Sequence, residues 1–79
     1  MSARNFARVF VRETGLTPAE FVERTRVEAA RRRLEESSDG IETVATACGF
    51  GTRESMRRAF LRQLHVSPGA YRNRFRTAA

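Results

Sequence analysis

Apolar residues recur along this chain at the spacing of α-helices, and no segment alternates between apolar and polar residues as a half-buried strand does. In the first segment, Phe6, Val9 and Phe10 share one helical face, and Gly15 is a typical residue just after a helix end. We therefore predict a helix over residues 3–14. Helical spacing continues in the later segments, so the sequence predicts an all-α fold.

A second, longer helix begins with a complete start signal. Thr17 supplies an N-cap hydroxyl, Pro18 presets the first helical residue, and Glu20 stands at the capping-box position. We predict that the helix continues to about Glu36. Its apolar stripe changes sides along its length, with an early and a late group: Phe21, Val22 and Thr25, then Val27, Ala30 and Leu34. We therefore expect its two halves to contact two different lobes.

Three shorter helices follow. The first ends at Gly49, and its apolar residues stand at i, i+3, i+4 and i+7: Ile41, Val44, Ala45 and Cys48. Thr52 is an N-cap for the second, and the spacing predicts its buried face: Met56, Ala59, Phe60 and Gln63. Ser67 and Pro68 form the start signal of the third. Because Cys48 lies on an apolar stripe, we predict a buried thiol rather than a reactive one.

An internal repeat relates the two ends of the chain. At an offset of fifty residues, positions 2–26 align with 52–76, and the identical residues include arginines, a phenylalanine and a proline: Arg8, Phe10, Arg12, Pro18, Arg24 and Arg26. Because helix caps match at the same offset, we interpret the repeat as a duplicated structural unit. The second copy follows a short helix, whereas the first begins at Met1 without a counterpart. We therefore expect one complete and one truncated helix-turn-helix unit, with the first as the looser lobe.

These observations divide the chain into three parts within one domain. We expect residues 1–16 to be the remnant of the first unit, residues 17–37 to be the linker helix, and residues 38–79 to hold the second unit with a C-terminal helix. A chain of 79 residues fits a single domain, since longer chains are usually needed for a second core.

The segment 41–64 has the layout of a helix-turn-helix: a short helix, a tight turn containing glycine, and a longer helix with charge on its outer face. Such a turn holds the second helix at the angle needed to enter a major groove. Five charged residues stand on or beside the outer face: Arg53, Glu54, Arg57, Arg58 and Arg62. Arginine can donate two hydrogen bonds to guanine, and glutamate can accept one from cytosine. These residues are therefore candidates for contact with DNA.

The first lobe repeats this arrangement. Arg4 and Arg8 fall at the same outward positions, with Arg12 beside them, although a solvated surface would explain any one of these arginines. The linker helix spans roughly 27 Å, somewhat under the roughly 34 Å of one duplex turn. We therefore predict that recognition helices 52–64 and 2–14 enter successive major grooves.

Charge supports the same partner. The chain has fifteen basic and nine acidic residues and a net charge of +6, which indicates an anionic partner such as nucleic acid, although solubility alone is a competing reason. All the basic residues are arginine, a bias that a GC-rich genome would also produce. One cysteine and one histidine predict no disulfide framework, metal site or cofactor, and fit a reducing cytoplasm. No apolar run is long enough for a membrane span.

Several short motifs stand out together: Cys48-Gly49-Phe50, Arg58-x-Phe60, Ser67-Pro68-x-x-Tyr71-Arg72, and the stretch from Arg8-x-Phe10 to Thr17-Pro18-x-x-Phe21. With them, nearly the whole chain resembles the C-terminal DNA-binding domain of AraC/XylS-type bacterial transcription regulators. The resemblance implies two helix-turn-helix subdomains on adjacent major grooves near promoters. Carried over by position, it implies these base-facing residues: Arg4, Ala7 and Arg8, then Arg53, Glu54, Arg57 and Arg58.

The sequence departs from this family's pattern at three points. Members of the family carry two more helices before the position of Met1. His65 stands where glycine is usual after the recognition helix, which predicts strain at that helix end. Met56 replaces a common aromatic residue.

We expect double-stranded promoter or operator DNA as the partner, at the bacterial nucleoid, and RNA polymerase or a second copy of the chain as further partners. Two alternatives remain open. One is a protein-interaction module that uses the apolar first lobe, and the other is a non-specific binder of RNA or of a membrane surface. An enzyme is the least favoured class, because the sequence shows no paired carboxylates, no nucleophile with a base and no glycine-rich phosphate loop.

Overall fold

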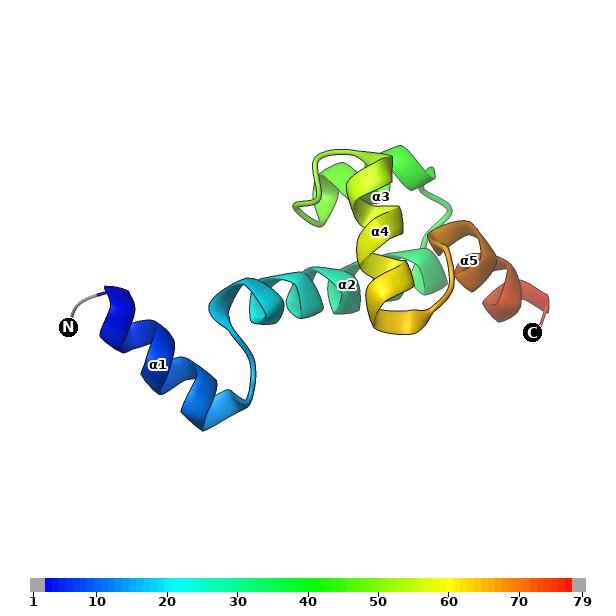
Figure 1. Cartoon of the computed structure of the whole chain (residues 1–79). Helices are drawn as coiled ribbons and strands as arrows, with labels where there is room; N and C mark the ends of the chain where they lie inside the picture. Colours follow the sequence, from blue (N-terminus) through cyan, green and yellow to red (C-terminus); the bar gives the residue numbers. More distant parts are fainter. Residues whose placement is uncertain (1–2, 78–79) are drawn as a thin grey trace.

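Five α-helices and no strand make up residues 3–77, the part of the chain that the computed structural model describes. Figure 1 shows α1 projecting to one side, while α3, α4 and α5 gather near the far end of α2. The helices have these bounds: α1 Ala3–Thr14, α2 Pro18–Glu36, α3 Ile41–Ala47, α4 Arg53–Leu64 and α5 Pro68–Thr77. The predicted all-α fold is confirmed. Residue 2, the predicted start of the first recognition helix, lies outside the described residues.

The linker helix α2 begins at the predicted start signal. Thr17 has an extended backbone, and its hydroxyl accepts a hydrogen bond from the Glu20 backbone N–H at 3.1 Å. Pro18 occupies the first turn, where its missing N–H costs no hydrogen bond. With 19 residues, α2 is about 29 Å long, at about 1.5 Å per residue. It is therefore long enough to contact both ends of the molecule.

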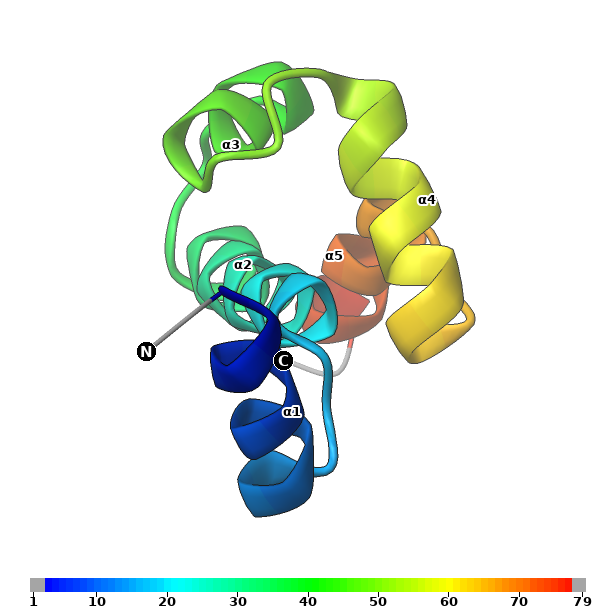
Figure 2. The same cartoon turned by 60° about the vertical axis from the view of Figure 1, so that its left-hand side comes forward.

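The hydrophobic core lies between the second half of α2 and the three helices that follow it. Figure 2 shows α2, α3, α4 and α5 around a common interior, with α1 outside that group. The buried residues of the core come from all four of these helices and include Cys48, just after the last residue of α3: Val27, Ala30, Leu34, Val44, Ala45, Cys48, Met56, Ala59, Phe60 and Tyr71. The late stripe of the linker helix and the buried thiol are as predicted.

One predicted core residue is wrong. Gln63 is exposed, and its side-chain amide donates a hydrogen bond to Glu23 at 3.0 Å. At this point the last turn of α4 contacts Glu23, a polar residue on the first half of α2, and not the apolar interior. Periodicity placed Gln63 on the correct face of its own helix but could not show what that face meets.

Two side chains of α5 fasten it to the linker helix. The Arg72 guanidinium donates hydrogen bonds to the backbone carbonyls of Leu34, Ser37 and Asp39, at and beyond the end of α2. The Tyr71 hydroxyl donates to Glu35, and its ring packs edge-on against Phe60 with 6.0 Å between ring centroids. Because helix ends leave carbonyl groups without intrahelical partners, the Arg72 contacts stabilise the end of α2.

The first lobe has a smaller apolar cluster of its own. The Phe10 ring lies 5.7 Å from Phe6 and 5.2 Å from Phe21, measured between centroids, and these contacts join α1 to the start of α2. Phe6 nevertheless remains 51% exposed and Phe21 45% exposed. Among the described residues, no further helix covers this cluster in the way that α3 covers Met56 and Phe60. The two halves of α2 therefore contact two lobes, as the change in its apolar stripe predicts.

Candidate nucleic-acid interface

A tight corner between α3 and α4 sets the direction of α4. Gly49 and Gly51 both have left-handed backbone conformations, with φ of +88° and +84°. The backbone N–H groups of Phe50 and Gly51 donate to the carbonyl of Ala45, at 2.9 and 3.3 Å. Only glycine adopts such φ values readily, so the two glycines permit the chain to reverse within a few residues. The predicted glycine-containing turn is therefore present.

Gly49 also lies close to a side chain of the linker helix. A Cβ atom at this position would lie 3.0 Å from Nε of Arg26 on α2. The Arg26 side chain thus runs beneath the corner, a contact that the sequence pattern did not reveal.

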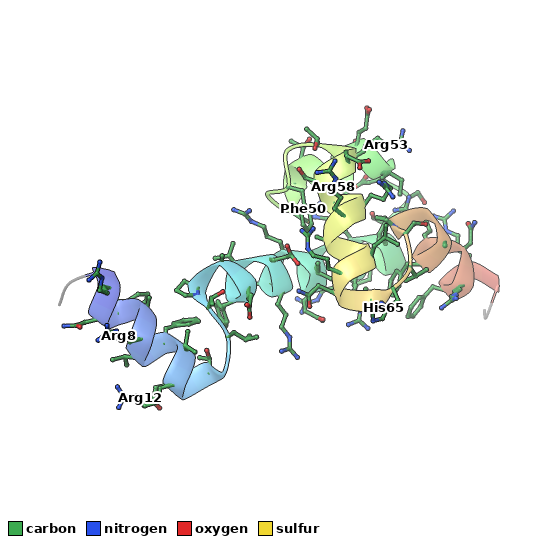
Figure 3. All side chains as sticks on the ribbon, in the orientation of Figure 1. Arg8, Arg12, Phe50, Arg53, Arg58 and His65 are labelled. Atoms are coloured by element: carbon green, nitrogen blue, oxygen red, sulfur yellow. The ribbon has the colours of Figure 1, made fainter. Side chains whose placement is uncertain are left out.

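The recognition helix α4 has a buried side and a charged side. The Thr52 hydroxyl caps its start by accepting a hydrogen bond from the Ser55 N–H at 3.1 Å. Met56 and Phe60 are fully buried beneath the helix, whereas the residues on its outer side are exposed: Arg53, Glu54, Arg57, Arg58 and Arg62. Arg53 lies near the start of α4 in Figure 3, with Arg58 further along the helix. The predicted facing of α4 is therefore confirmed.

Ion pairs link three residues of this outer side. Glu54 accepts two hydrogen bonds from Arg57, at 2.6 and 2.9 Å, and one from Arg58 at 3.1 Å. These contacts from Arg57, and secondarily from Arg58, lower the pKa of the Glu54 carboxyl to about 2. The Glu54 carboxylate therefore holds both guanidinium groups along the helix surface.

Arg62 makes a different contact, to the linker helix. Its Nη2 and Nε donate to the two carboxylate oxygens of Glu23, at 2.7 and 3.2 Å. Hydrogen bonds from Arg62 and Gln63 lower the pKa of Glu23. Sequence reasoning grouped Arg62 with the outer arginines and missed Glu23, because the two residues lie on different helices and 39 positions apart.

An open groove of about 590 Å³ lies between the first half of α2 and the side of α4 that faces it. Arginines from both helices line this groove: Arg26, Arg58 and Arg62. Basic groups from two helices therefore border one concave surface, which single-helix patterns did not predict.

The predicted contact residues of α1 lie apart from those of α4. Arg4 and Arg8 are exposed and Ala7 is half-buried, and Figure 3 shows Arg8 and Arg12 on the helix that projects away from the second lobe. The structure thus presents two charged helix surfaces, one on each lobe, joined by α2. It does not bring the side chains of the two sets together into one cluster.

In residues 3–77, no group of three or more His, Cys, Asp or Glu side chains is placed to hold a metal ion. No helix in this range has the length and apolar character needed to cross a membrane. Cys48 is buried, and burial raises the pKa of its thiol.

Comparison with known proteins places this arrangement in a family. Residues 1–74 match a family described as a helix-turn-helix domain. The chain belongs to the AraC-type helix-turn-helix family. The match includes both lobes and the linker helix between them, so the resemblance drawn from the short motifs is confirmed.

Similar proteins are regulators or DNA-binding domains. The chain is 53% identical over 75 residues to the HTH-type transcriptional regulator Rv1931c of Mycobacterium tuberculosis, which covers 95% of this chain and 29% of that protein. It is 36% identical over 70 residues to the HTH-type transcriptional activator RhaS of Pectobacterium carotovorum, covering 89% of this chain and 25% of the relative. The chain thus spans under a third of the length of these relatives.

A solved structure matches the fold closely. The crystal structure of the DNA-binding domain of AdpA, described as a global transcriptional factor and solved with a target DNA, superposes with a TM-score of 0.94. The sequences are 41% identical, and the match covers 99% of this chain and 70% of that one. The fold of both lobes is therefore that of a domain known to bind DNA.

Proposed function

We propose that this chain is the sequence-specific DNA-binding part of a transcription regulator, with α4 in one major groove of promoter DNA and α1 in the next. One observation carries the proposal. After a corner of two left-handed glycines, α4 buries Met56 and Phe60 and presents its arginines to solvent. A basic helix held rigidly from beneath in this way suits insertion into a groove about 12 Å wide. The DNA-bound AdpA domain supports the same use of this fold.

The outer residues take different parts in this proposal. Three arginines of α4 contact base edges or phosphates: Arg53, Arg57 and Arg58. A second set of contacts comes from α1: Arg4, Ala7 and Arg8. Glu54 accepts a hydrogen bond from a base amino group. Arg62 contacts phosphate with the part of its guanidinium that Glu23 leaves open. The phosphate contacts set position on the duplex, and the base contacts set sequence preference.

The proposed division of the chain follows from these roles. Residues 1–16 and 38–79 each supply one DNA-contacting lobe, and residues 17–37 fix the distance between them. With α2 about 29 Å long, the lobes suit sites separated by about one duplex turn of 34 Å. Binding, and not catalysis, is the activity we propose.

The exposed apolar cluster of the first lobe favours a second candidate function. Phe6 and Val9 on α1 are 51% and 36% exposed, and Phe21 on α2, which packs against Phe10, is 45% exposed. Exposed apolar patches of this kind mark protein contacts. A second copy of the chain is the proposed partner, and sedimentation of the DNA-free protein tests it: a concentration-dependent dimer supports this contact, and a monomer at all concentrations contradicts it. RNA polymerase at the promoter remains a further proposed partner.

A selection experiment tests the main proposal. The full chain is incubated with a library of random duplexes at several salt concentrations, and the bound DNA is sequenced. We expect an enriched motif with two half-sites about 10 base pairs apart, together with an affinity that falls steeply as salt rises. Binding without any enriched motif would contradict sequence-specific recognition and favour a non-specific nucleic-acid binder.

A further inference from the structure

Glu54 occupies an unusual place on a surface proposed to bind a polyanion. It is the one acidic residue among the five outer residues of α4, and its side chain is 51% exposed. Its carboxylate lies 2.6 Å from Nη2 of Arg57 and 3.1 Å from Nε of Arg58. A phosphate that approaches either guanidinium therefore meets a negative charge already bound there.

We propose that Glu54 determines specificity by lowering the affinity for non-matching DNA more than the affinity for matching DNA. On a non-matching duplex, phosphates compete with Glu54 for Arg57 and Arg58 and are repelled by its charge. On a matching duplex, a cytosine or adenine amino group opposite Glu54 donates to the carboxylate that the arginines release. Only the matching site replaces the hydrogen bonds that Glu54 gives up. This inference rests on the proposed function.

The size of the effect follows from the exposure of these groups. Exposed ion pairs three or four residues apart on a helix are weak, so two of them together change a binding constant by about three- to fivefold. Each additional phosphate contact steepens the dependence of log affinity on log salt by about 0.9. Releasing both arginines should therefore raise non-specific affinity by about fivefold. It should also steepen the dependence of log affinity on log salt by the amount expected for about one or two additional phosphate contacts.

The substitution Glu54→Gln tests the proposal in the full chain, because glutamine keeps the shape and removes the charge. Glu36→Gln, which removes the same charge from an exposed residue of α2, is the matched control. Each variant is titrated with the duplex selected by the wild-type chain and with a shuffled duplex of the same composition, at several salt concentrations. Circular dichroism confirms that each variant is folded.

We expect Glu54→Gln to bind the shuffled duplex about fivefold more tightly, with a steeper salt slope, and to discriminate less between the two duplexes. Glu36→Gln should stay within about twofold of the wild type on the shuffled duplex. An unchanged affinity of Glu54→Gln for the shuffled duplex overturns the proposal. So does a loss confined to the selected duplex, because that result assigns Glu54 to base contact alone.

The proposed function and this inference fail in different ways. If the wild-type chain does not distinguish the two duplexes, sequence-specific binding itself is wrong, and the inference falls with it. If the wild type discriminates and Glu54→Gln discriminates equally well, only the role of Glu54 is wrong.

Discussion

Glu23 and Arg62 join the linker helix to the end of the recognition helix through two hydrogen bonds between one carboxylate and one guanidinium. The pair adds a polar contact to the apolar contacts between α2 and α4. A planar guanidinium bound at two points has little freedom to rotate, so the pair helps to fix the direction of α4 relative to α2. The angle at which the second lobe presents its arginines therefore depends partly on a residue of the linker.

The Glu23–Arg62 pair predicts a specific dependence of stability on pH. Because Arg62 lowers the pKa of Glu23 in the folded state, the unfolded chain takes up the proton first as the pH falls. The stability that the pair contributes is therefore complete above about pH 4.5 and lost as the pH falls through the lower folded pKa. We expect Glu23→Gln to be less stable than the wild type at pH 7, with the difference shrinking below pH 4.5. Urea denaturation from pH 7 to pH 3 measures this.

Phe60 and Phe6 predict a contrast between the two lobes. Phe60 is fully buried, so Phe60→Ala should cost about 3 to 5 kcal/mol by opening the core. Phe6 is 51% exposed, so Phe6→Ala should cost less than about half as much. Chemical denaturation of both variants provides the measurement. Equal losses would contradict the assignment of the core to the second lobe.

Local sequence signals predicted the helices well because each depends on near neighbours. The Thr17-Pro18 and Thr52 caps, and the apolar spacing of Val27, Ala30 and Leu34, describe interactions within one helix, and the structure shows each as predicted. The prediction that Gln63 is buried was wrong for a related reason: periodicity identifies a face of a helix but not the element that the face meets. Contacts between distant segments, such as Arg26 beneath Gly49, leave no pattern in a single sequence.

His65 predicts a gain in stability on substitution. It ends α4 in the left-handed conformation, with φ of +59°, as the departure from the usual glycine led us to expect. A residue with a Cβ atom costs roughly 1 kcal/mol in this conformation, so His65→Gly should stabilise the protein by about 0.5 to 1 kcal/mol. His65→Val, with a branched Cβ, should destabilise it. Thermal denaturation of the pair checks the sign of each effect, and a loss of stability in His65→Gly would contradict the explanation.

The corner glycines can be compared with each other. Gly49→Ala and Gly51→Ala both force a Cβ into a left-handed conformation, at a cost of about 1 to 2 kcal/mol. At Gly51 nothing lies within 4 Å of the added atom, whereas at Gly49 the Arg26 side chain must also move. We expect Gly49→Ala to be the more destabilising by a small margin, since the end of an arginine side chain shifts easily. Urea denaturation measures both, and no loss in either variant would contradict the geometry of the corner.

The sequence predicted which side of α4 is exposed at the candidate interface, but not the contacts among the charged residues on that side. Arg53, Arg57 and Arg58 are exposed because Met56 and Phe60 fix which side of α4 is buried, and that relation follows from helical spacing. Pairing among charged residues is less determined, since one carboxylate has several arginines within reach. The double contact of Glu54 with Arg57 and Arg58 therefore required the structure.

The most direct test of the account compares Arg58→Ala with Arg32→Ala. Both substitutions remove one exposed arginine, from α4 and from α2 respectively. Their affinities for the selected duplex are measured by fluorescence anisotropy at several salt concentrations. We predict that Arg58→Ala binds about tenfold more weakly with unchanged folding, as expected for loss of a base or phosphate contact, while Arg32→Ala stays within about twofold of the wild type. Equal affinities of the two variants would contradict the claim that the outer side of α4 binds DNA.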